Sequence, residues 1–273
     1  MMSGLKRYML FCCCFVLFSC SKGDDNIIDP PGGGDTTAVN PFNYTDSVFY
    51  LNSGQQDYEV SPVQSRRGTY YGFPEGIDID KNTGTINVSK SETGLKYLVS
   101  FVPDDHSDTL TTFVTISGIN YLDGFYKLGT ADSILKPVYN GIPEAAIPGL
   151  NNGTVFDIGS GCNDQGCNVI PESAVINLAQ TVRNGVFGKT PSNNDRHEFE
   201  LVYRINDKSG KATNKLKVKL YYFETMADVT PEADSIISSR QGTIITKSSS
   251  APSLSVQQRI AKPRPPCIFI VGR

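Results

Sequence analysis

Apolar and polar residues alternate along short stretches of the chain, and turn residues separate these stretches. At 76–89, GIDIDKNTGTINVS places Ile77 and Ile79 before an Asn-Thr-Gly turn, with Ile86 and Val88 after it. Apolar residues at every second position on both sides of such a turn predict a β-hairpin. Denser apolar runs follow at 95–102 and 111–117. We expect these runs to be more deeply buried strands.

The clearest alternation lies at 197–205 and 215–223, HEFELVYRI and KLKVKLYYF. One side of this pair is apolar, and the other carries Glu on the first strand and Lys on the second. The pattern predicts an antiparallel hairpin with one face on the core and one in water. Opposed Glu and Lys side chains would contribute about 0.2–1 kcal/mol per pair. The residues expected to face the core are Phe199, Leu201, Tyr203, Ile205, Leu216, Val218, Leu220 and Tyr222.

Two further elements are predicted near the end of the chain. TPEADSIISSR at 230–240 has Thr230 as a helix cap and Pro231 at the first helical position, so a short helix is expected there. CIFIV at 267–271 is an apolar run that could return to complete a sheet, with Cys267 as a buried strand residue. Together these patterns define an all-β protein.

The first 19 residues have the pattern of a secretory signal. Lys6 and Arg7 supply a positive start, residues 8–18 are apolar, and Ser19 is small. The apolar run is shorter than the roughly 20 residues that a membrane-spanning helix needs. Residues 20–44 then hold Asp, Asn, Pro and Gly, including PPGGG. This composition favours a flexible tether.

The end of the leader, Leu17-Phe18-Ser19-Cys20, resembles the lipobox of bacterial lipoproteins. The resemblance implies that Cys20 is lipidated and that residues 1–19 are removed; an ordinary secretory signal is the alternative. The following Ser21-Lys22-Gly23-Asp24-Asp25 resembles the export signal of surface lipoproteins in the Bacteroidota. That resemblance implies an anchored protein facing outward from the outer membrane, whereas a charged periplasmic spacer is the alternative reading.

The stretch PEGIDIDKNTGTINV followed by GLKYLVSF resembles bacterial immunoglobulin-like and cadherin-like repeats, over residues 58–118. With the hairpin at 197–223, it implies two immunoglobulin-like β-sandwich domains in tandem after a disordered, lipid-anchored tether. The expected boundaries are a signal peptide at 1–19, a tether at 20–44, one sandwich at 45–118, a second at 119–228, and a C-terminal segment at 229–273.

Cysteine usage and charge narrow the chemistry. Cys162 and Cys167 lie in the short polar stretch GCNDQGC, and an oxidising compartment predicts a disulfide between them.

Asp78, Asp80 and Asn82 match the first ligands of an EF-hand, but Thr83 and Ser89 stand where Gly and Glu are needed. The turn is therefore expected to be structural, and no metal is expected. Without residues 1–19 the chain has 23 Lys and Arg against 28 Asp and Glu, a net charge of −5. The sequence has no basic stripe with interleaved aromatic residues, so a nucleic-acid partner is not expected.

No catalytic or cofactor fingerprint is present: the sequence lacks a nucleophile elbow, a P-loop, a zinc helix and a dinucleotide motif. His106 and His197 are expected to face solvent, and only acids brought together from distant positions could form a glycosidase pair. We therefore expect a non-enzymatic surface lipoprotein with an adhesive or scaffolding role and a protein or glycan partner. The alternative is a glycan-binding lipoprotein of a polysaccharide-utilisation system, with aromatic rings exposed at Tyr70, Tyr71, Tyr121 and Tyr126.

Overall fold

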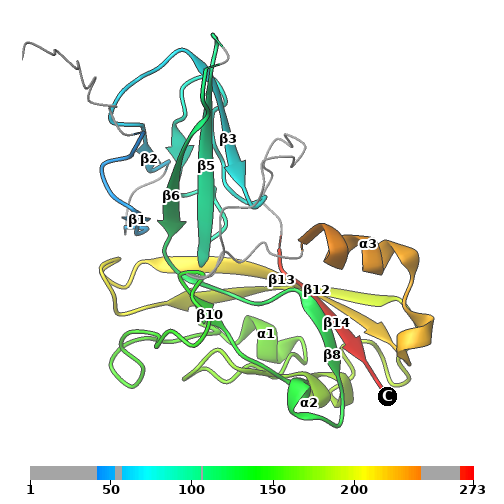
Figure 1. Cartoon of the computed structure of the whole chain (residues 1–273). Coiled ribbons are helices and arrows are strands. Elements are labelled where there is room, and N and C mark those ends of the chain that lie inside the picture. Colours follow the sequence, from blue (N-terminus) through cyan, green and yellow to red (C-terminus); the bar gives the residue numbers. More distant parts are fainter. Residues whose placement is uncertain (1–41, 53–56, 106, 241–264) are drawn as a thin grey trace, which may run out of the picture. The chain divides into compact units, whose positions relative to one another are not determined.

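A computed structural model of the chain describes residues 42–52, 57–105, 107–240 and 265–273. All of these residues belong to one compact unit, Asn40–Arg273. Strands form most of its regular structure, and its helices are few and short, which confirms the predicted all-β class (Figure 1).

The first half of this unit is built around a four-stranded sheet with the order β1-β6-β5-β3. Strands β3 (Gly68–Phe73), β5 (Leu95–Pro103) and β6 (Leu110–Ile116) are antiparallel neighbours, and β1 (Val48–Phe49) pairs parallel with the end of β6. The strands predicted at 95–102 and 111–117 are thus confirmed.

The predicted hairpin at 76–89 forms its turn but only one bridge, between Ile79 and Ile86. Strand β4 (Ile86–Asn87) instead pairs with β2 (Glu59–Val60), which makes a separate two-stranded sheet. The alternation was right about burial, since Ile77, Ile86 and Val88 are fully buried. It could not reveal that a more distant segment pairs with β4.

The first core lies on one face of the four-stranded sheet and takes apolar side chains from residues 42–116. Phe42 and Tyr44 belong to this core, and Tyr44 also bridges to Pro62. The tether predicted to end at residue 44 therefore ends earlier, because aromatic rings at these two positions are packed against the sheet.

The second half is built around a four-stranded sheet with the order β12-β13-β14-β8. Strands β12 (Asp195–Arg204) and β13 (Thr213–Phe223) form the predicted antiparallel hairpin, which is confirmed. The predicted last strand, β14 (Cys267–Val271), lies between β13 and β8 (Gly124–Lys127) and is parallel to both. The C-terminal segment thus supplies an inner strand of this sheet, and Cys267 is buried in it as predicted.

One face of this second sheet is covered by a layer of short segments, and the other is covered in part by α3 (Figure 1). A large core lies between one face and a layer of short segments. The helix α3 (Pro231–Arg240) packs over part of the other face through Ala233, Ile236 and Ile237. The facing layer consists of η1 (Ala131–Ser133), β9 (Ile134–Leu135), α1 (Gly161–Asp164), β11 (Ile176–Asn177) and α2 (Leu178–Arg183). The remaining described elements are β7 (Ile119–Asn120), β10 (Val138–Tyr139) and η2 (Met226–Asp228).

Helix α3 confirms the helix predicted at 230–240. The hydroxyl of Thr230 accepts a hydrogen bond from the backbone N–H of Ala233 at 3.3 Å, so it caps the first turn. Pro231 occupies the first helical position, where its missing N–H costs nothing.

A buried polar junction joins the two halves. The hydroxyl of Tyr203 on β12 lies 2.8 Å from the hydroxyl of Thr93 and accepts a hydrogen bond from the Ile119 N–H at 3.1 Å. The side chain of Asn120 donates to the carbonyl of Thr93 at 2.9 Å. The hydroxyl of Ser117 donates to Asp207 at 3.3 Å. These bonds connect segments more than 25 residues apart, so they fix the two halves to each other.

Candidate binding surface

The outward side of the β12–β13 hairpin carries alternating charges. We use the name charged face for Arg196, Glu198, Glu200, Arg204, Lys215, Lys217 and Lys219, which alternate with the core residues of the two strands. Glu198 lies opposite Lys219, and Glu200 lies opposite Lys217, as the alternation predicts. Within the face, Lys215 lies 2.8 Å from Glu200, and Glu198 lies 3.4 Å from Lys217 and 3.6 Å from Lys219. These partly exposed pairs add at most about 1 kcal/mol each to stability.

A groove of about 320 Å³ lies at one end of the charged face. Three consecutive cross-strand pairs form it: Arg196 with Tyr221, His197 with Leu220, and Glu198 with Lys219. Its volume is at the lower end of the range for small-ligand sites, about 300–1,000 Å³. The lining combines two cations, a carboxylate and an aromatic ring.

Arg196 is held in place at this groove. Its side chain donates to the Asn194 amide oxygen at 3.2 and 3.1 Å and to the Glu232 carboxylate at 2.9 Å. Its guanidinium also lies over the ring of Tyr221, 5.2 Å from the centroid, and that ring stacks on Phe269. The bonds use Nε and Nη2, so Nη1 has no hydrogen-bond partner within the described part of the chain and remains available to a ligand.

His197 does not face water as predicted. Its ring lies on the side of Phe199, with centroids 6.4 Å apart, and its Nε2 is buried without a hydrogen-bond partner among the described residues. Burial lowers the pKa of His197, so the imidazole is neutral at neutral pH. The prediction was wrong because it placed His197 on the same side as its neighbour Glu198, and adjacent strand residues point to opposite sides. His106 lies outside the described residues.

Two of the four tyrosines predicted as exposed rings are buried. Tyr70 and Tyr121 are each 1% exposed, so neither can stack on a sugar, and the prediction is corrected for both. The Tyr121 hydroxyl donates to the Ala174 carbonyl at 2.6 Å, which lets the ring enter the core. Tyr71 and Tyr126 are half-buried, and they lie on β3 and β8, in different sheets.

The acidic turn at 78–83 is held together by hydrogen bonds to Asp80. One Asp80 carboxylate oxygen accepts hydrogen bonds from the N–H groups of Asn82 and Thr83, both at 2.8 Å, and from the Thr83 hydroxyl at 3.0 Å. These bonds, first among them that from the Thr83 backbone, lower the pKa of Asp80. Within the described ranges, no group of three or more His, Cys, Asp or Glu side chains is placed to hold a metal ion.

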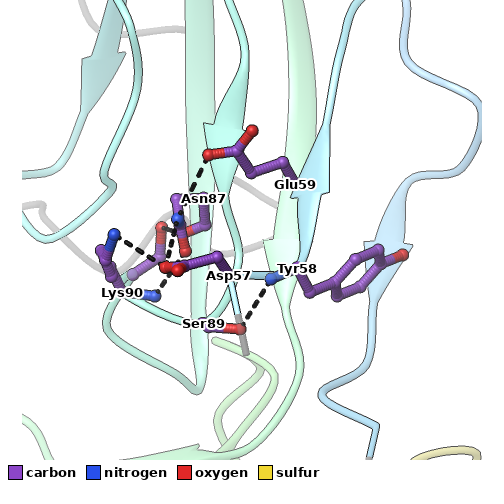
Figure 2. Close-up of polar contacts among 7 residues, drawn as sticks. Asp57, Tyr58, Glu59, Asn87, Ser89 and Lys90 are labelled. Atoms are coloured by element: carbon purple, nitrogen blue, oxygen red, sulfur yellow. Dashed lines mark hydrogen bonds and ion pairs between the residues drawn. The ribbon is translucent and has the colours of Figure 1, made fainter. Parts of the chain in front are cut away.

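A polar cluster next to this turn ties β2 to β4 (Figure 2). The Asn87 amide donates to Asp57 at 3.3 Å and to Glu59 at 3.4 Å, and Lys90 pairs with Asp57 at 2.7 Å. The hydrogen bond from Lys90 lowers the pKa of Asp57. The Lys90 ammonium occupies the place where these acids would otherwise attract a cation, so the cluster serves to hold the edge strands together.

Cys162 and Cys167 are both buried in the second core and are described as free thiols. The Cys162 thiol donates to the Glu200 carbonyl of β12 at 3.5 Å, and the backbone N–H of Cys167 donates to the Cys162 carbonyl at 3.0 Å. Burial raises the pKa of both thiols, to about 12 for Cys167. The structure brings the pair together, and the disulfide stays a prediction.

The leader, Cys20 and the tether as far as residue 41 lie outside the described residues. Among those that are described, no helix has the length and apolar character to cross a membrane. Sequence reasoning missed the groove and the roles of Arg196 and Tyr221. Arg196 and Glu198 were visible in the sequence as charged neighbours on one strand. Glu232, which pairs with Arg196, lies on α3.

No model of a protein family matches the chain, and the comparison with curated proteins finds no match. Among solved structures, the chain is similar to the crystal structure of Drosophila N-cadherin EC1-4, with 13% identity and a TM-score of 0.21. The match covers 66% of this chain and 49% of the cadherin chain, so this chain spans about half the length of that structure. The all-β class rests on the strands described above and not on this likeness.

Proposed function

We propose that this protein is a lipid-anchored, non-enzymatic binding protein with an adhesive or scaffolding role at the outer surface of a bacterial outer membrane. The proposed location is inferred from Leu17–Cys20 and from Ser21–Asp25, through the resemblances described above. Two or more acyl chains on Cys20 would hold the protein firmly, whereas one would bind a membrane only marginally.

The observation that carries the binding role is the open charged face with its groove. The charged side chains of this face pair mainly with one another at the surface. They do not neutralise a buried charge in the core, so they are accessible to a partner. The junction around Tyr203 fixes the body that carries the face. A fixed body on a tether presents its surface to a partner without losing conformational entropy when it binds.

The chemistry near the groove favours binding over catalysis. The Nε2 of His197 is buried, so a substrate in the groove could not reach it. A general base needs hydrogen-bond reach to the proton that it removes. Arg196 and Lys219 offer donors, and Glu198 offers acceptors, which are the groups that orient a ligand.

The first test is the anchor. Cys20→Ser should move the protein from the membrane fraction to the soluble fraction, and externally added protease should digest the wild-type protein on intact cells. Cys14→Ser is the matched control, because it removes a cysteine from the leader and should leave the protein anchored. Membrane retention of the Cys20→Ser variant, or protection of the wild-type protein from protease, would contradict the proposed address.

The second test is binding by a soluble fragment, residues 40–273, which contains the whole compact unit and its cores. The fragment is applied to an array of glycans and to intact cells from which the full-length protein has been deleted. Saturable binding to either supports the proposed role. A folded fragment that binds neither would contradict it.

A further inference from the structure

The charged face carries an excess of positive charge on an acidic protein. The residues that define the face are five cations and two carboxylates, and Glu232 of α3 adds a third carboxylate through its pair with Arg196. The chain without its leader has a net charge of −5. A local excess of cations on such a chain attracts an anionic partner, and this attraction is strongest at low ionic strength.

The cations are arranged in a row. Lys215, Lys217 and Lys219 occupy alternate positions on β13, so their Cα atoms are about 7 Å apart along the strand. Arg196 continues the row at the groove, where it lies over Tyr221. The face therefore offers successive cationic positions to an extended ligand, with a concave end that could hold one unit of it.

The groups beside the cations point to a saccharide. Glu198 and Glu200 lie on β12 opposite Lys219 and Lys217, and their carboxylates accept hydrogen bonds only, which suits hydroxyl groups. An acidic polypeptide offers these two side chains only its backbone N–H groups, which alternate in direction along an extended chain, whereas hydroxyl groups lie along the whole length of a polysaccharide. A neutral glycan would leave the excess cations without a counter-charge. An anionic polysaccharide meets both requirements, because it carries carboxylate or sulfate groups together with hydroxyls.

We propose that the charged face binds an anionic polysaccharide along Lys215, Lys217 and Lys219, with one sugar unit in the groove beside Arg196. This inference rests on the proposed function and names the ligand class of the same surface. Arg196 Nη1 and Lys219 would bind the acidic group of that unit, since guanidinium and ammonium groups form charge-assisted hydrogen bonds with carboxylate and sulfate.

The test uses the fragment 40–273 and four probes: polygalacturonate, dextran sulfate, neutral dextran and polyglutamate. We expect binding to one or both anionic polysaccharides, with weaker binding as salt rises. Binding to polygalacturonate alone would identify a carboxylated ligand, and binding to dextran sulfate alone a sulfated one. Equal binding to neutral dextran, or equal binding to polyglutamate, would overturn the assignment.

The double variant Lys217→Gln/Lys219→Gln should bind the preferred polysaccharide about tenfold more weakly in 0.1 M salt. Lys136→Gln/Lys189→Gln is the matched control, because it removes two exposed charges away from the charged face. Equal affinities of the two variants, both with wild-type unfolding midpoints, would overturn the inference. If the fragment binds none of the four probes while the anchored protein is digested by protease on intact cells, this inference fails and the proposed surface address stands.

Discussion

The junction between the two halves can be tested by removing one oxygen atom. Tyr203 is fully buried, and its hydroxyl is shared by Thr93 from the first half and the Ile119 N–H from the start of the second. Tyr203→Phe keeps the ring and deletes only these bonds. The substitution therefore measures what the polar junction contributes to folding.

The expected cost follows from the two partners. A buried hydrogen bond contributes about 0.5–1.5 kcal/mol net, and a buried donor left without a partner costs about 1–3 kcal/mol. The Ile119 N–H loses its acceptor, while the Thr93 hydroxyl can turn toward another. We expect a loss of about 2–3 kcal/mol in the free energy of unfolding. For a unit of this size that corresponds to a fall in Tm of about 4–12 °C.

The assay is urea unfolding of the fragment 40–273, with Tyr71→Phe as the control, because Tyr71 is half-buried and its hydroxyl has no hydrogen bond to the described residues. A double-mutant cycle with Thr93→Val separates the Thr93 contribution, which we expect to be about 1 kcal/mol. A Tyr203→Phe variant within about 0.5 kcal/mol of the Tyr71→Phe control would refute the reasoning.

Three further predictions concern the same unit. Gly94→Ala should destabilise the protein by about 3 kcal/mol or more in urea unfolding, because φ of Gly94 is +76° and an added Cβ would lie 2.3 Å from the Ile119 backbone. An unchanged midpoint would contradict this. Burial raises the pKa of Tyr203 to about 12, above the usual value near 10, so a stability contribution of roughly 2–3 kcal/mol is present below pH 10 and is lost as pH rises from 10 through 12. A Tyr203→Phe variant with the same loss of stability at alkaline pH would contradict this. In protein isolated from the cell envelope under acid quench, intact mass should show Cys162 and Cys167 as a disulfide, which leaves Cys267 as the one alkylatable thiol among the described residues after unfolding. Recovery of three alkylatable thiols, those of Cys162, Cys167 and Cys267, would exclude the disulfide.

Local alternation and apolar runs were enough to predict five strands of the two large sheets, β5, β6, β12, β13 and β14, but not β1, β3 or β8. Alternation is informative because its period of two reports which side chains are buried. It correctly placed Phe199 and Leu201 on the core side and Glu200 outside. It predicted the partner within the β12–β13 hairpin but could not predict partners that are distant in sequence. Strand β14 lies between two strands that are distant in sequence, and the hydrogen bond from the Cys267 N–H to Asp123 at 2.6 Å connects residues 144 positions apart.

The predicted sites failed where burial depends on a distant partner. Tyr121 looked like an exposed ring because nothing nearby in sequence marks the Ala174 carbonyl that accepts its hydroxyl. The groove went unnoticed for the same reason: the position of Arg196 depends on Glu232, 36 residues away. The Glu and Lys positions of the charged face were visible in the sequence, but a face can be assigned a ligand only after its net charge and shape are known.

Strand β12 carries a residue of the polar junction, Tyr203, on one side and part of the charged face on the opposite side. Tyr203 points inward to Thr93, and Glu198 and Glu200 point outward to the lysines of β13. A shift of one residue in register would exchange the two sides, so the hairpin must keep its pairing for either to exist. Because the two sets of side chains share a backbone but no contacts, their effects should separate. Substitutions at Lys217 and Lys219 should change binding with little change in stability, whereas Tyr203→Phe should lower stability and leave the affinity of the folded fragment unchanged.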